Sequence, residues 1–506
     1  MMDQEGPFTP PTYVAHSEVH HAAAARQNDE VAAAASTELK AMLSGTSPME
    51  RILLKAAAGA GKSYALKRMV AEAVTHPNCA RVAVVAFQNK QIRDLAPALG
   101  EALGRDAVCL FAAQATWGDI PDEVFEKVEV ATTATAIPQS AVVVIATVSK
   151  LGAMGELRRL TDHLGSGHSS GSPFDALFVD EAWQVAHHLF DKITKVAPKW
   201  VGVGDVGQLP PLEAGQNPWR GDPGYNPYRA WPTDYDGDAR TWTRELPAVW
   251  RPAAGHLALW RAFYPEWESL ECVAGPGDRA VDLGTMSGPE TVIWQQVGTG
   301  VPTLLEVDGL PEPEAADVDL PLTDFVEELL DSFFAAGPSL IRAEYDTDDS
   351  GRSTGITTTL RSGGPHQDPL VTILATRNQS VDDAEQAVER LRKRHDLTDR
   401  DLVASTVDSW QGRTNGITIA VHPLNGADEL DSFNSAFGRL AVACTRATHG
   451  LLMVTRPGLD TLLGEAPARP GTPFGEPGNR QLPRQTHQRI LATFARGQID
   501  VSDDDE

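Results

Sequence analysis

Short apolar runs recur along the first half of the chain, and each is bounded by polar or glycine-containing segments. Continuous runs without alternation are typical of parallel strands that are buried on both faces. The runs predicted as strands are residues 52–54, 82–87, 141–146, 176–179 and 200–203. Helical periods separate these runs, so the pattern predicts an α/β fold with a parallel sheet.

The same alternation resumes near residue 303, with apolar runs at 370–374, 416–421 and 451–454. A stretch rich in Pro, Gly and Trp separates the two series, so two α/β lobes of similar size are expected. The predicted segments are a flexible N-terminal part (1–27), a first lobe (28–245), a second lobe (246–465) and a Pro/Gly-rich tail with a short helix and an acidic end (466–506).

Three local predictions complete this outline. Asn28 and Asp29 are expected to cap a helix over about 30–44, because short polar side chains satisfy the first N–H groups of a helix. Residues 344–368 carry Gly and Asp clusters and are expected to form a surface loop. The short helix of the tail is predicted at 487–496.

Composition indicates an ordinary soluble globular protein. The 506 residues are 42% hydrophobic and 22% charged, which is enough for two or three domains. The four cysteines are scattered without a C-x-x-C pair, so neither a disulfide framework nor a zinc site is indicated. No signal peptide and no membrane-length apolar run is recognised. A cytoplasmic location without a membrane partner is therefore expected.

The charge balance is strongly acidic. With 69 acidic against 43 basic residues, the net charge is −26, which argues against nonspecific binding to nucleic acid through a broad basic surface. A groove lined locally by Lys and Arg stays compatible with this balance, because salt screens distant charges.

Residues 56–63, Ala-Ala-Ala-Gly-Ala-Gly-Lys-Ser, lie between a predicted strand and a predicted helix. A strand, a glycine-bearing turn and a helix in this order form a phosphate-binding loop, in which backbone N–H groups surround phosphate oxygens. Ala56 stands where the usual pattern begins with glycine. Lys62 is predicted to contact the β- and γ-phosphates, and Ser63 to hold Mg²⁺. The candidate nucleotide contacts are Gly59, Ala60, Gly61, Lys62, Ser63 and Tyr64.

Two adjacent carboxylates, Asp180 and Glu181, close the predicted strand 176–179. Asp180 is suited to hold Mg²⁺, and Glu181 to orient and deprotonate an attacking water. A structural Asp-Glu pair at a strand end is a common alternative. The phosphate loop upstream favours the catalytic interpretation.

The segment 203–211 ends another apolar run with Gly-Asp-x-x-Gln-Leu-Pro-Pro. With this motif the chain resembles the superfamily 1 helicases, in particular the group typified by the nonsense-mediated decay helicase. Further segments are similar to that family's motifs and follow in its order: 86–95, 146–151, 246–252 (Leu-Pro-Ala-Val-Trp-Arg-Pro), 406–413 (Thr-Val-Asp-Ser-Trp-Gln-Gly-Arg) and 438–447. The resemblance covers about residues 50–456.

The resemblance implies two RecA-like lobes with ATP and Mg²⁺ between them. It implies that Gln208 senses the γ-phosphate and that Gly412 lies at the nucleotide. Arg251 and Arg446 of the second lobe are implied to neutralise charge as the γ-phosphate leaves. Isolated arginines are more often solvated surface residues, but Arg446 stands beside a predicted buried strand.

Two positions depart from the family. Thr414 stands where the family commonly has a glutamate thought to bind the ribose. Gln27 is the only glutamine in the region where the family has an adenine-reading glutamine, and it lies far from Lys62 in sequence. The preference for ATP is therefore implied by the resemblance and is not carried by a particular residue.

Candidate nucleic-acid contacts are Asn89, Lys90, Thr147 and Ser149, because amides and short hydroxyls bind phosphates without reading bases. Trp219 is predicted either to stack on a base or to pin its loop as a buried ring. The other tryptophans of this region are expected to pack in the core or between lobes: Trp231, Trp242, Trp250, Trp260 and Trp267.

The function that we expect is ATP-dependent translocation on a nucleic acid, with unwinding. Single-stranded DNA is favoured over RNA, because no RNA-binding domain is recognised, and the resemblance implies 5′→3′ movement. One alternative is a nucleic-acid-stimulated ATPase that acts as a motor or switch subunit without unwinding by itself. Another is a phosphate-loop enzyme acting on a small molecule, against which the ordered motifs weigh. No protein partner is indicated.

Overall fold

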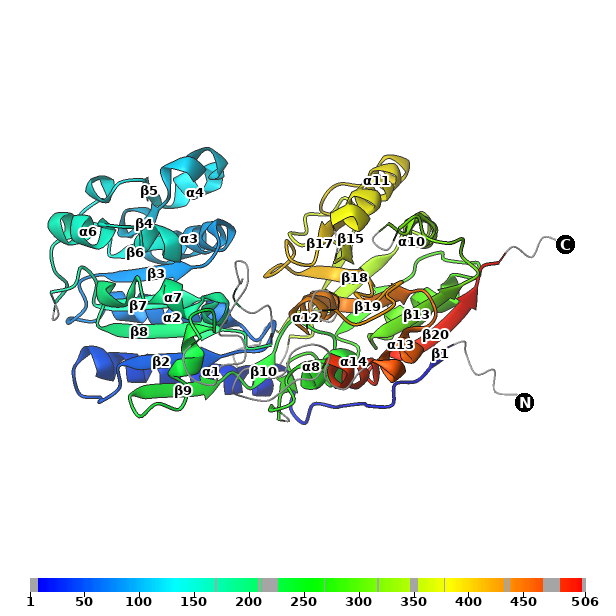
Figure 1. Cartoon of the computed structure of the whole chain (residues 1–506), viewed down its shortest axis with the longest axis horizontal. Coiled ribbons are helices and arrows are strands. Elements are labelled where there is room, and N and C mark those ends of the chain that lie inside the picture. The colour runs from blue at the N-terminus through cyan, green and yellow to red at the C-terminus, as the bar shows by residue number, and fades with distance from the viewer. Residues whose placement is uncertain are drawn as a thin grey trace. The chain divides into compact units, whose positions relative to one another are not determined.

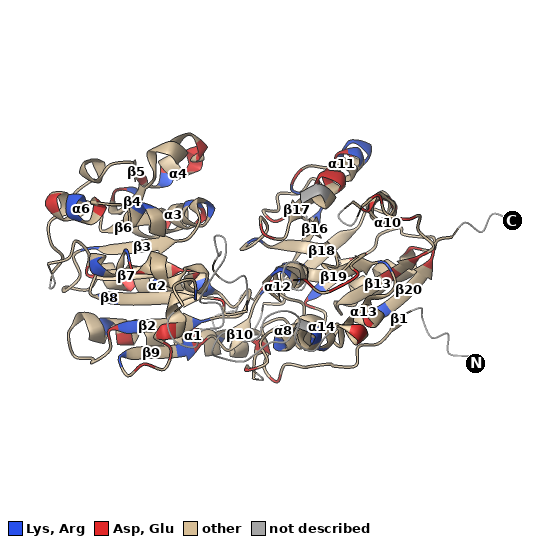
Figure 2. Ribbon diagram, viewed as in Figure 1, with Lys and Arg blue, Asp and Glu red and all other residues tan. Residues whose placement is uncertain are grey.

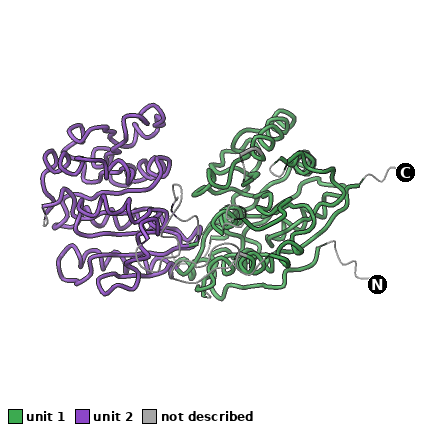
Figure 3. Tube along the Cα trace, in the orientation of Figure 1, with its two compact units in different colours: residues 1–26, 207–209, 247–506 green, residues 27–206, 210–246 purple. Residues whose placement is uncertain are grey.

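The computed structural model describes residues 8–168, 171–207, 211, 226–267, 269–315, 318–345, 354–376, 378–431, 434, 437–466 and 483–502. The chain divides into two compact units (Figure 3). We call the unit of Gln27–Val206 and Pro210–Leu246 the first lobe. The unit of Met1–Arg26, Gly207–Leu209 and Pro247–Glu506 is the second lobe. Each lobe is an α/β unit with its own sheet (Figure 1).

The first lobe contains an eight-stranded sheet in the order β5-β4-β6-β3-β7-β8-β2-β9. Every neighbouring pair in this sheet is parallel, as the continuous apolar runs predicted. The strands are β2 (Arg51–Lys55), β3 (Val82–Ala86), β4 (Val108–Phe111), β5 (Glu129–Ala131), β6 (Val143–Thr147), β7 (Ala176–Asp180), β8 (Lys199–Gly204) and β9 (Thr241–Glu245).

The register of this sheet brings five strand ends to one edge. Lys55 of β2 lies opposite Gly204 of β8, and Asp180 of β7 lies opposite Val203. On the other side of β7, Ala86 of β3 lies opposite Thr147 of β6. In parallel sheets the connections that follow these ends carry ligand sites. The carboxyl edge of β2, β8, β7, β3 and β6 is therefore the place to look for chemistry.

The α-helices of the first lobe are α1 (His21–Leu43, which crosses the division between the two units), α2 (Lys62–Val74), α3 (Asn89–Leu103), α4 (Asp122–Lys127), α5 (Val148–Leu151), α6 (Glu156–Leu164) and α7 (His187–Phe190). The 3₁₀ turns are η1 (Arg105–Ala107), η2 (Gln114–Asp119), η3 (Ala134–Ala136), η4 (Ala182–Gln184), η5 (Thr194–Val196) and η6 (Trp231–Asp234). α1 begins nine residues before the expected start at 30, because the four alanines after His21 have the highest helix propensity.

The second lobe contains a seven-stranded sheet in the order β1-β20-β13-β19-β18-β16-β17. Only the edge pair of β1 and β20 is antiparallel. The strands are β1 (Phe8–Thr9), β13 (Thr303–Asp308), β16 (Val371–Ala375), β17 (Leu402–Thr406), β18 (Asn415–Val421), β19 (Ala447–Thr455) and β20 (Ala495–Asp500).

β20 lies inside the segment that the sequence indicated as a tail. It pairs with β13 over six residues, from Ala495 opposite Thr303 to Asp500 opposite Asp308. Its sequence, Ala-Arg-Gly-Gln-Ile-Asp, lacks an apolar run because the strand is partly exposed near the edge of the sheet. The helix expected at 487–496 is α14, Pro483–Leu491, and it ends before this strand.

The other helices of the second lobe are α8 (Leu257–Phe263), α9 (Thr291–Gly298), α10 (Leu320–Ala335), α11 (Asn378–His395), α12 (Phe437–Cys444) and α13 (Leu459–Glu465), with the 3₁₀ turn η7 (Ala254–His256). A small antiparallel sheet joins β12 (Arg279–Asp282), β14 (Ser339–Ala343) and β15 (Thr357–Arg361), and β10 (Ala248–Val249) pairs with β11 (Glu271–Cys272). β15 lies where a surface loop was expected, because its alternating exposed threonines carry no apolar signal.

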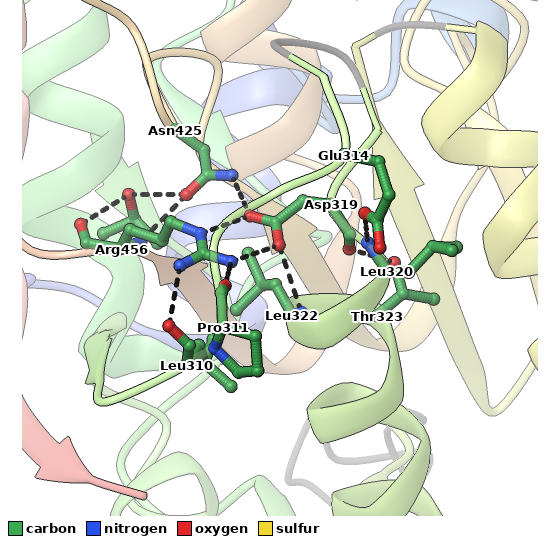
Figure 4. Close-up of polar contacts among 10 residues, drawn as sticks. Leu310, Pro311, Glu314, Asp319, Leu320, Leu322, Thr323, Asn425 and Arg456 are labelled. Carbon is green, nitrogen blue, oxygen red and sulfur yellow. Dashed lines mark hydrogen bonds and ion pairs between the residues drawn. The ribbon is translucent and has the colours of Figure 1, made fainter. Parts of the chain in front are cut away.

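A polar network holds the end of β19 against the start of α10 (Figure 4). The Arg456 Nε donates to Asp319 at 2.8 Å, and Asn425 Nδ2 donates to the same carboxylate at 3.0 Å. Asp319 also accepts from the backbone N–H of Leu322 and so caps α10. Burial by itself would raise the pKa of Asp319. The hydrogen bonds from Arg456 and Asn425 outweigh burial and hold this pKa below its ordinary value. This network fixes the carboxyl edge of the second-lobe sheet.

Buried aromatic rings fill both cores. Trp231 and Trp260 are completely buried, and Trp231 stacks on Phe190 with ring centroids 3.9 Å apart, so the prediction that these two tryptophans pack is confirmed. Lys, Arg, Asp and Glu occur on elements of both lobes (Figure 2). Among the described helices, none is long and apolar enough to cross a lipid bilayer.

Candidate functional site

The loop between β2 and α2 has the backbone that phosphate binding requires. Gly59 and Gly61 have φ of 75° and 94°, a left-handed conformation that favours glycine. Gly61 is the N-cap of α2 and no side chain caps this helix start, as is typical of helix starts that bind anions. Ala56, in place of the usual first glycine, is not among the non-glycine residues with positive φ. The substitution therefore needs no strained backbone.

Two contacts anchor this loop from outside. The Ala56 N–H donates to the carbonyl of Gly204 at the end of β8, at 2.9 Å. Asn28 of α1 is buried and donates from Nδ2 to the carbonyl of Ala60 at 2.8 Å. The sequence indicated Asn28 only as a helix cap. No motif or spacing in the sequence connects Asn28 with Ala60, so this contact was not predicted. Gln27 precedes Asn28 in the same helix.

Lys62 and Glu181 form the central ion pair of the first lobe. Lys62 Nζ donates to both carboxylate oxygens of Glu181, at 2.8 and 2.9 Å, and the two side chains are 11% and 13% exposed. Glu181 has φ of 49° and ψ of 46°, a left-handed conformation that is costly for a residue with a Cβ. Such strain is maintained where the surroundings fix it, and it is concentrated at functional sites.

Asp180 ends β7 directly before this turn. Its Oδ1 accepts from the backbone N–H of Glu181 at 3.0 Å. Burial, and after it the charge of Glu181, raise the pKa of Asp180, while Lys62 opposes the shift. The donor set of the Asp180 carboxylate and the Ser63 hydroxyl consists of hard oxygens. It fits Mg²⁺, which binds proteins through one or two carboxylates and keeps several waters.

The predicted nucleic-acid contacts of the first lobe lie together. Asn89 and Lys90 begin α3, shortly after β3. Thr147 ends the neighbouring strand β6, and Ser149 follows it in α5. Thr147 is buried and its Oγ1 accepts from the N–H of Lys150 at 3.1 Å, so its hydroxyl caps α5. Ser149 is exposed. Gln208 and Trp219 lie outside the described residues.

The second lobe brings the two predicted arginines to one cluster. Arg251 donates from Nε to Thr414 Oγ1 and from Nη1 to the carbonyl of Thr445, each at 3.1 Å. Arg446 is completely buried and donates from Nη2 to Thr445 Oγ1 at 2.7 Å. Thr414, the departure from the family pattern, therefore positions Arg251. Gly412, two residues before it, has φ of 82° and requires glycine.

Trp250, which precedes Arg251, is predicted to pack in the core or between the lobes, and within the second lobe it is only partly covered. Its side chain is 36% exposed and its ring makes an edge contact with Tyr345, with centroids 6.2 Å apart.

Part of the chain matches a known protein family, and solved structures are similar to most of it. Residues 36–218 match the protein family AAA_30, described as an AAA domain. No curated protein matches the chain. Solved structures to which the chain is similar include "The structure of PRRSV helicase" (14% identity, TM-score 0.37, 83% of this chain and 56% of that chain). Another is "Crystal Structure of DUF1998 helicase MrfA bound to DNA" (8% identity, TM-score 0.39, 87% of this chain and 52% of that chain).

The chain spans about half the length of these two helicase structures. The AAA match covers the phosphate loop, Asp180 and Glu181. The chain is thus an α/β protein of two RecA-like lobes, whose residues 36–218 match the AAA domain family, in agreement with its resemblance to the superfamily 1 helicases.

Proposed function

We propose that this protein hydrolyses ATP at the phosphate loop of its first lobe. The observation that carries the proposal is the pairing of Lys62 with Glu181, whose backbone is held in a left-handed turn beside an uncapped helix start. ATP phosphates bound at Gly59, Ala60 and Gly61 would compete with Glu181 for Lys62, because both partners are anionic. The substrate itself would then release the carboxylate that hydrolysis needs.

Each first-lobe residue has a distinct role in this proposal. Lys62 binds the β- and γ-phosphates, and Tyr64, which is exposed, lies next to the nucleotide. Mg²⁺, held by Ser63 and Asp180, would neutralise charge on the phosphate oxygens. Glu181, once released from Lys62, orients the attacking water and accepts its proton. The raised pKa of Asp180 reflects the burial of a carboxylate that a cation would compensate.

The second lobe would complete the reaction. We propose that ATP lies between the lobes and that Arg251 and Arg446 bind the charge that develops as the γ-phosphate leaves. Gly412 and the exposed ring of Trp250 would contact the nucleotide, the latter by stacking on its base. Gln208 would sense the γ-phosphate. Closure of the lobes would then be linked to hydrolysis.

The residues that we propose to contact nucleic acid lie at the carboxyl edge of β3 and β6. Asn89, Lys90 and Ser149 would contact phosphates there, Thr147 would hold the start of α5 in place, and Trp219 would stack on a base. We propose 5′→3′ movement on single-stranded DNA, in preference to RNA, by lobes bounded at about 28–245 and 246–465. A cytoplasmic location belongs to the same proposal.

A second candidate is a nucleic-acid-stimulated ATPase that works as a subunit of a larger complex without unwinding by itself. Two observations favour it. The net charge of −26 disfavours tight, independent binding to DNA. Lys150, a basic residue at the candidate edge, is paired with Glu156 at 3.0 Å and so contributes little to a basic groove.

The test is steady-state ATP hydrolysis with and without single-stranded DNA, for the wild type, Lys62→Ala and Lys67→Ala. Lys67 lies on the same helix, outside the site, and serves as the matched control. Nucleic acid should raise the wild-type rate, Lys62→Ala should abolish turnover, and Lys67→Ala should preserve it. Turnover of Lys62→Ala near the wild-type rate would contradict the proposal.

Two further measurements separate the finer choices. Replacing DNA by RNA of the same sequence tests the nucleic-acid preference. Strand displacement from duplexes with a 5′ or a 3′ single-stranded tail tests both direction and unwinding. Stimulated hydrolysis without displacement in either duplex would support the subunit of a larger complex.

A further inference from the structure

One hydrogen bond connects the turn of Glu181 with the helix that begins at Asn89. Gln91, in the first turn of α3, donates from Nε2 to Oε1 of Gln184 at 3.1 Å. Gln184 ends η4, the turn that follows Glu181, and it is only 5% exposed. This amide pair therefore lies between the carboxylate proposed for hydrolysis and the residues proposed for nucleic-acid contact.

The α3 side of this bond has a fixed orientation. Gln91 Oε1 accepts from the backbone N–H of Gln88 at 2.9 Å, as part of a capping box at the start of α3. Only Nε2 of Gln91 is left to face Gln184, and a donor requires an acceptor. Gln184 must therefore present Oε1. As a result, Gln184 Nε2 is buried without a hydrogen-bond partner among the described residues.

The other side of the bond is tied to Glu181. The backbone N–H of Gln184 donates to the carbonyl of Glu181 at 2.9 Å, closing a short turn. Glu181 is the left-handed residue whose carboxylate Lys62 holds. A change of partner at the Glu181 carboxylate therefore acts on a strained turn whose far end is Gln184. An unpartnered buried donor is costly, so a reorientation that gives Gln184 Nε2 a hydrogen-bond partner would be favourable.

We propose that the Gln91–Gln184 hydrogen bond is a positioning link that couples the phosphate site to nucleic-acid binding at the start of α3. The inference rests on the proposed function and deepens it. Release of Glu181 from Lys62 relaxes the turn, the amide of Gln184 reorients, and the start of α3 with Asn89 and Lys90 shifts with it. Thermodynamic linkage requires the converse, so nucleic acid at α3 favours the hydrolytic state of the turn.

Substitutions at Gln184 separate coupling from packing. Gln184→Met keeps the length of the side chain, removes both amide atoms and leaves the capping box of α3 intact. Gln184→Glu keeps an acceptor for Gln91 Nε2. Gln114→Met, at an exposed glutamine of the same lobe, is the matched control.

A second set of variants keeps a polar contact between positions 91 and 184 in each single variant. In Gln91→Glu the new carboxylate still accepts from Gln88, and Gln184 can turn its amide to donate to it. In Gln184→Glu, Gln91 still donates. In the double variant two carboxylates face each other and neither can donate when ionised. Each single variant should therefore remain coupled and the double variant should not, which makes a double-mutant cycle.

The readouts are the ratio of ATPase rates with and without single-stranded DNA, and the DNA affinity with and without a non-hydrolysable ATP analogue. Coupling between sites typically amounts to about 5–150-fold. Gln184→Met and the double variant should reduce the wild-type coupling ratio by about fivefold or more. The DNA-free ATPase rate and the melting temperature should stay near those of Gln114→Met.

The outcomes distinguish this inference from the proposed function. A wild type whose ATPase ignores DNA would overturn the proposed function and the link together. A stimulated wild type with equal stimulation in Gln184→Met and in the double variant would overturn the link alone and leave the pair as packing. Reduced coupling in Gln184→Met and the double variant, with Gln184→Glu and Gln91→Glu still coupled, would support it.

Discussion

The two lobes hold their charged site residues in different ways. In the first lobe, Lys62 is held by an anion, the carboxylate of Glu181, on a strained turn. In the second lobe, Arg251 donates hydrogen bonds to a hydroxyl and a carbonyl oxygen, those of Thr414 and Thr445, and its charge also acts on the carboxyl of Asp368. We propose that an anionic substrate displaces Glu181 from Lys62, and that the hydrogen bonds of Arg251 to Thr414 and Thr445 persist while phosphate binds.

This difference indicates that the contacts of the first-lobe residue Lys62 change when substrate binds, and that those of the second-lobe residue Arg251 do not. The ion pair with Lys62 holds the proposed catalytic carboxylate, Glu181, until a phosphate binds to Lys62 in its place. The hydrogen bonds of Arg251 to Thr414 and Thr445 hold the direction of its planar guanidinium, and we propose that a guanidinium held in this way binds phosphate. We therefore propose that the exchange of partners takes place in the first lobe, at Lys62 and Glu181, and that Arg251 of the second lobe is already oriented before substrate binds.

The largest effect is expected at Arg446. Arg446→Ala should reduce the rate of ATP hydrolysis by on the order of 10³-fold or more, as for other arginine fingers, with little change in nucleotide affinity. Because Arg446 is completely buried, Arg446→Lys, which keeps the charge without the planar fork, accompanies it, with Lys393→Ala on α11 as the control. Single-turnover hydrolysis checks the rate. Full activity in both Arg446 variants would remove this residue from the site.

The next largest effect is expected at Glu181, the carboxylate that Lys62 holds. Glu181→Gln should slow turnover by about 10²–10⁴-fold, because the general base is lost. ATP binding should be kept or strengthened, because the carboxylate that Lys62 contacts directly is replaced by a neutral amide. Equilibrium binding of a fluorescent ATP analogue and steady-state hydrolysis, measured on the same sample, check the two halves. Loss of binding to the same degree as turnover would contradict the role of Glu181.

Acid should act on the second lobe through His256. This side chain is completely buried and stacks against Trp260, and burial lowers its pKa to about 4. In the unfolded chain this side chain takes up a proton near pH 6.5. The contribution of neutral His256 to the free energy of unfolding is therefore fully present above that pH and is lost as the pH falls from 6.5 to 4. The loss is at most about 3 kcal/mol.

Melting temperature against pH, for the wild type and His256→Phe, measures this contribution. The phenylalanine keeps a ring against Trp260 but cannot take up a proton. Its melting temperature should depend less on pH between 6.5 and 4 than that of the wild type. Parallel curves for the two proteins would show that His256 does not contribute.

The smallest effect is expected at Thr414. Thr414→Val removes the hydroxyl that holds Arg251 while keeping the shape of the side chain. One neutral hydrogen bond contributes about 1 kcal/mol, so the hydrolysis rate should fall by about fivefold. Thr414→Ser keeps the hydroxyl and should retain most of the activity. Equal rates in the two variants would show that Arg251 is positioned by its other contacts.

The sequence predicted the first lobe better than the second, and the reason is physical. Buried parallel strands leave continuous apolar runs, and the residues after them, such as Lys62 and Asp180, lie at one edge by geometry alone. β20 and β15 left no such run because they are partly exposed, so a tail and a loop were expected in their place.

Side-chain contacts between distant segments were not predictable from spacing. Asn28 lies 32 residues before Ala60, and Thr414 lies 163 residues after Arg251. No period or motif connects such pairs, because tertiary packing alone brings them together. The link of Gln91 with Gln184, across 93 residues, belongs to the same class, although each glutamine lies beside a recognised motif.

The exchange at Lys62 is tested most directly by a structure with Mg²⁺ and a non-hydrolysable ATP analogue. The account predicts that Lys62 Nζ leaves the carboxylate oxygens of Glu181, now 2.8 and 2.9 Å away, and contacts the β- and γ-phosphates. Glu181 should then face the γ-phosphate across a water molecule. A bound nucleotide whose phosphates lie away from Lys62, with the Lys62–Glu181 pair intact, would contradict it.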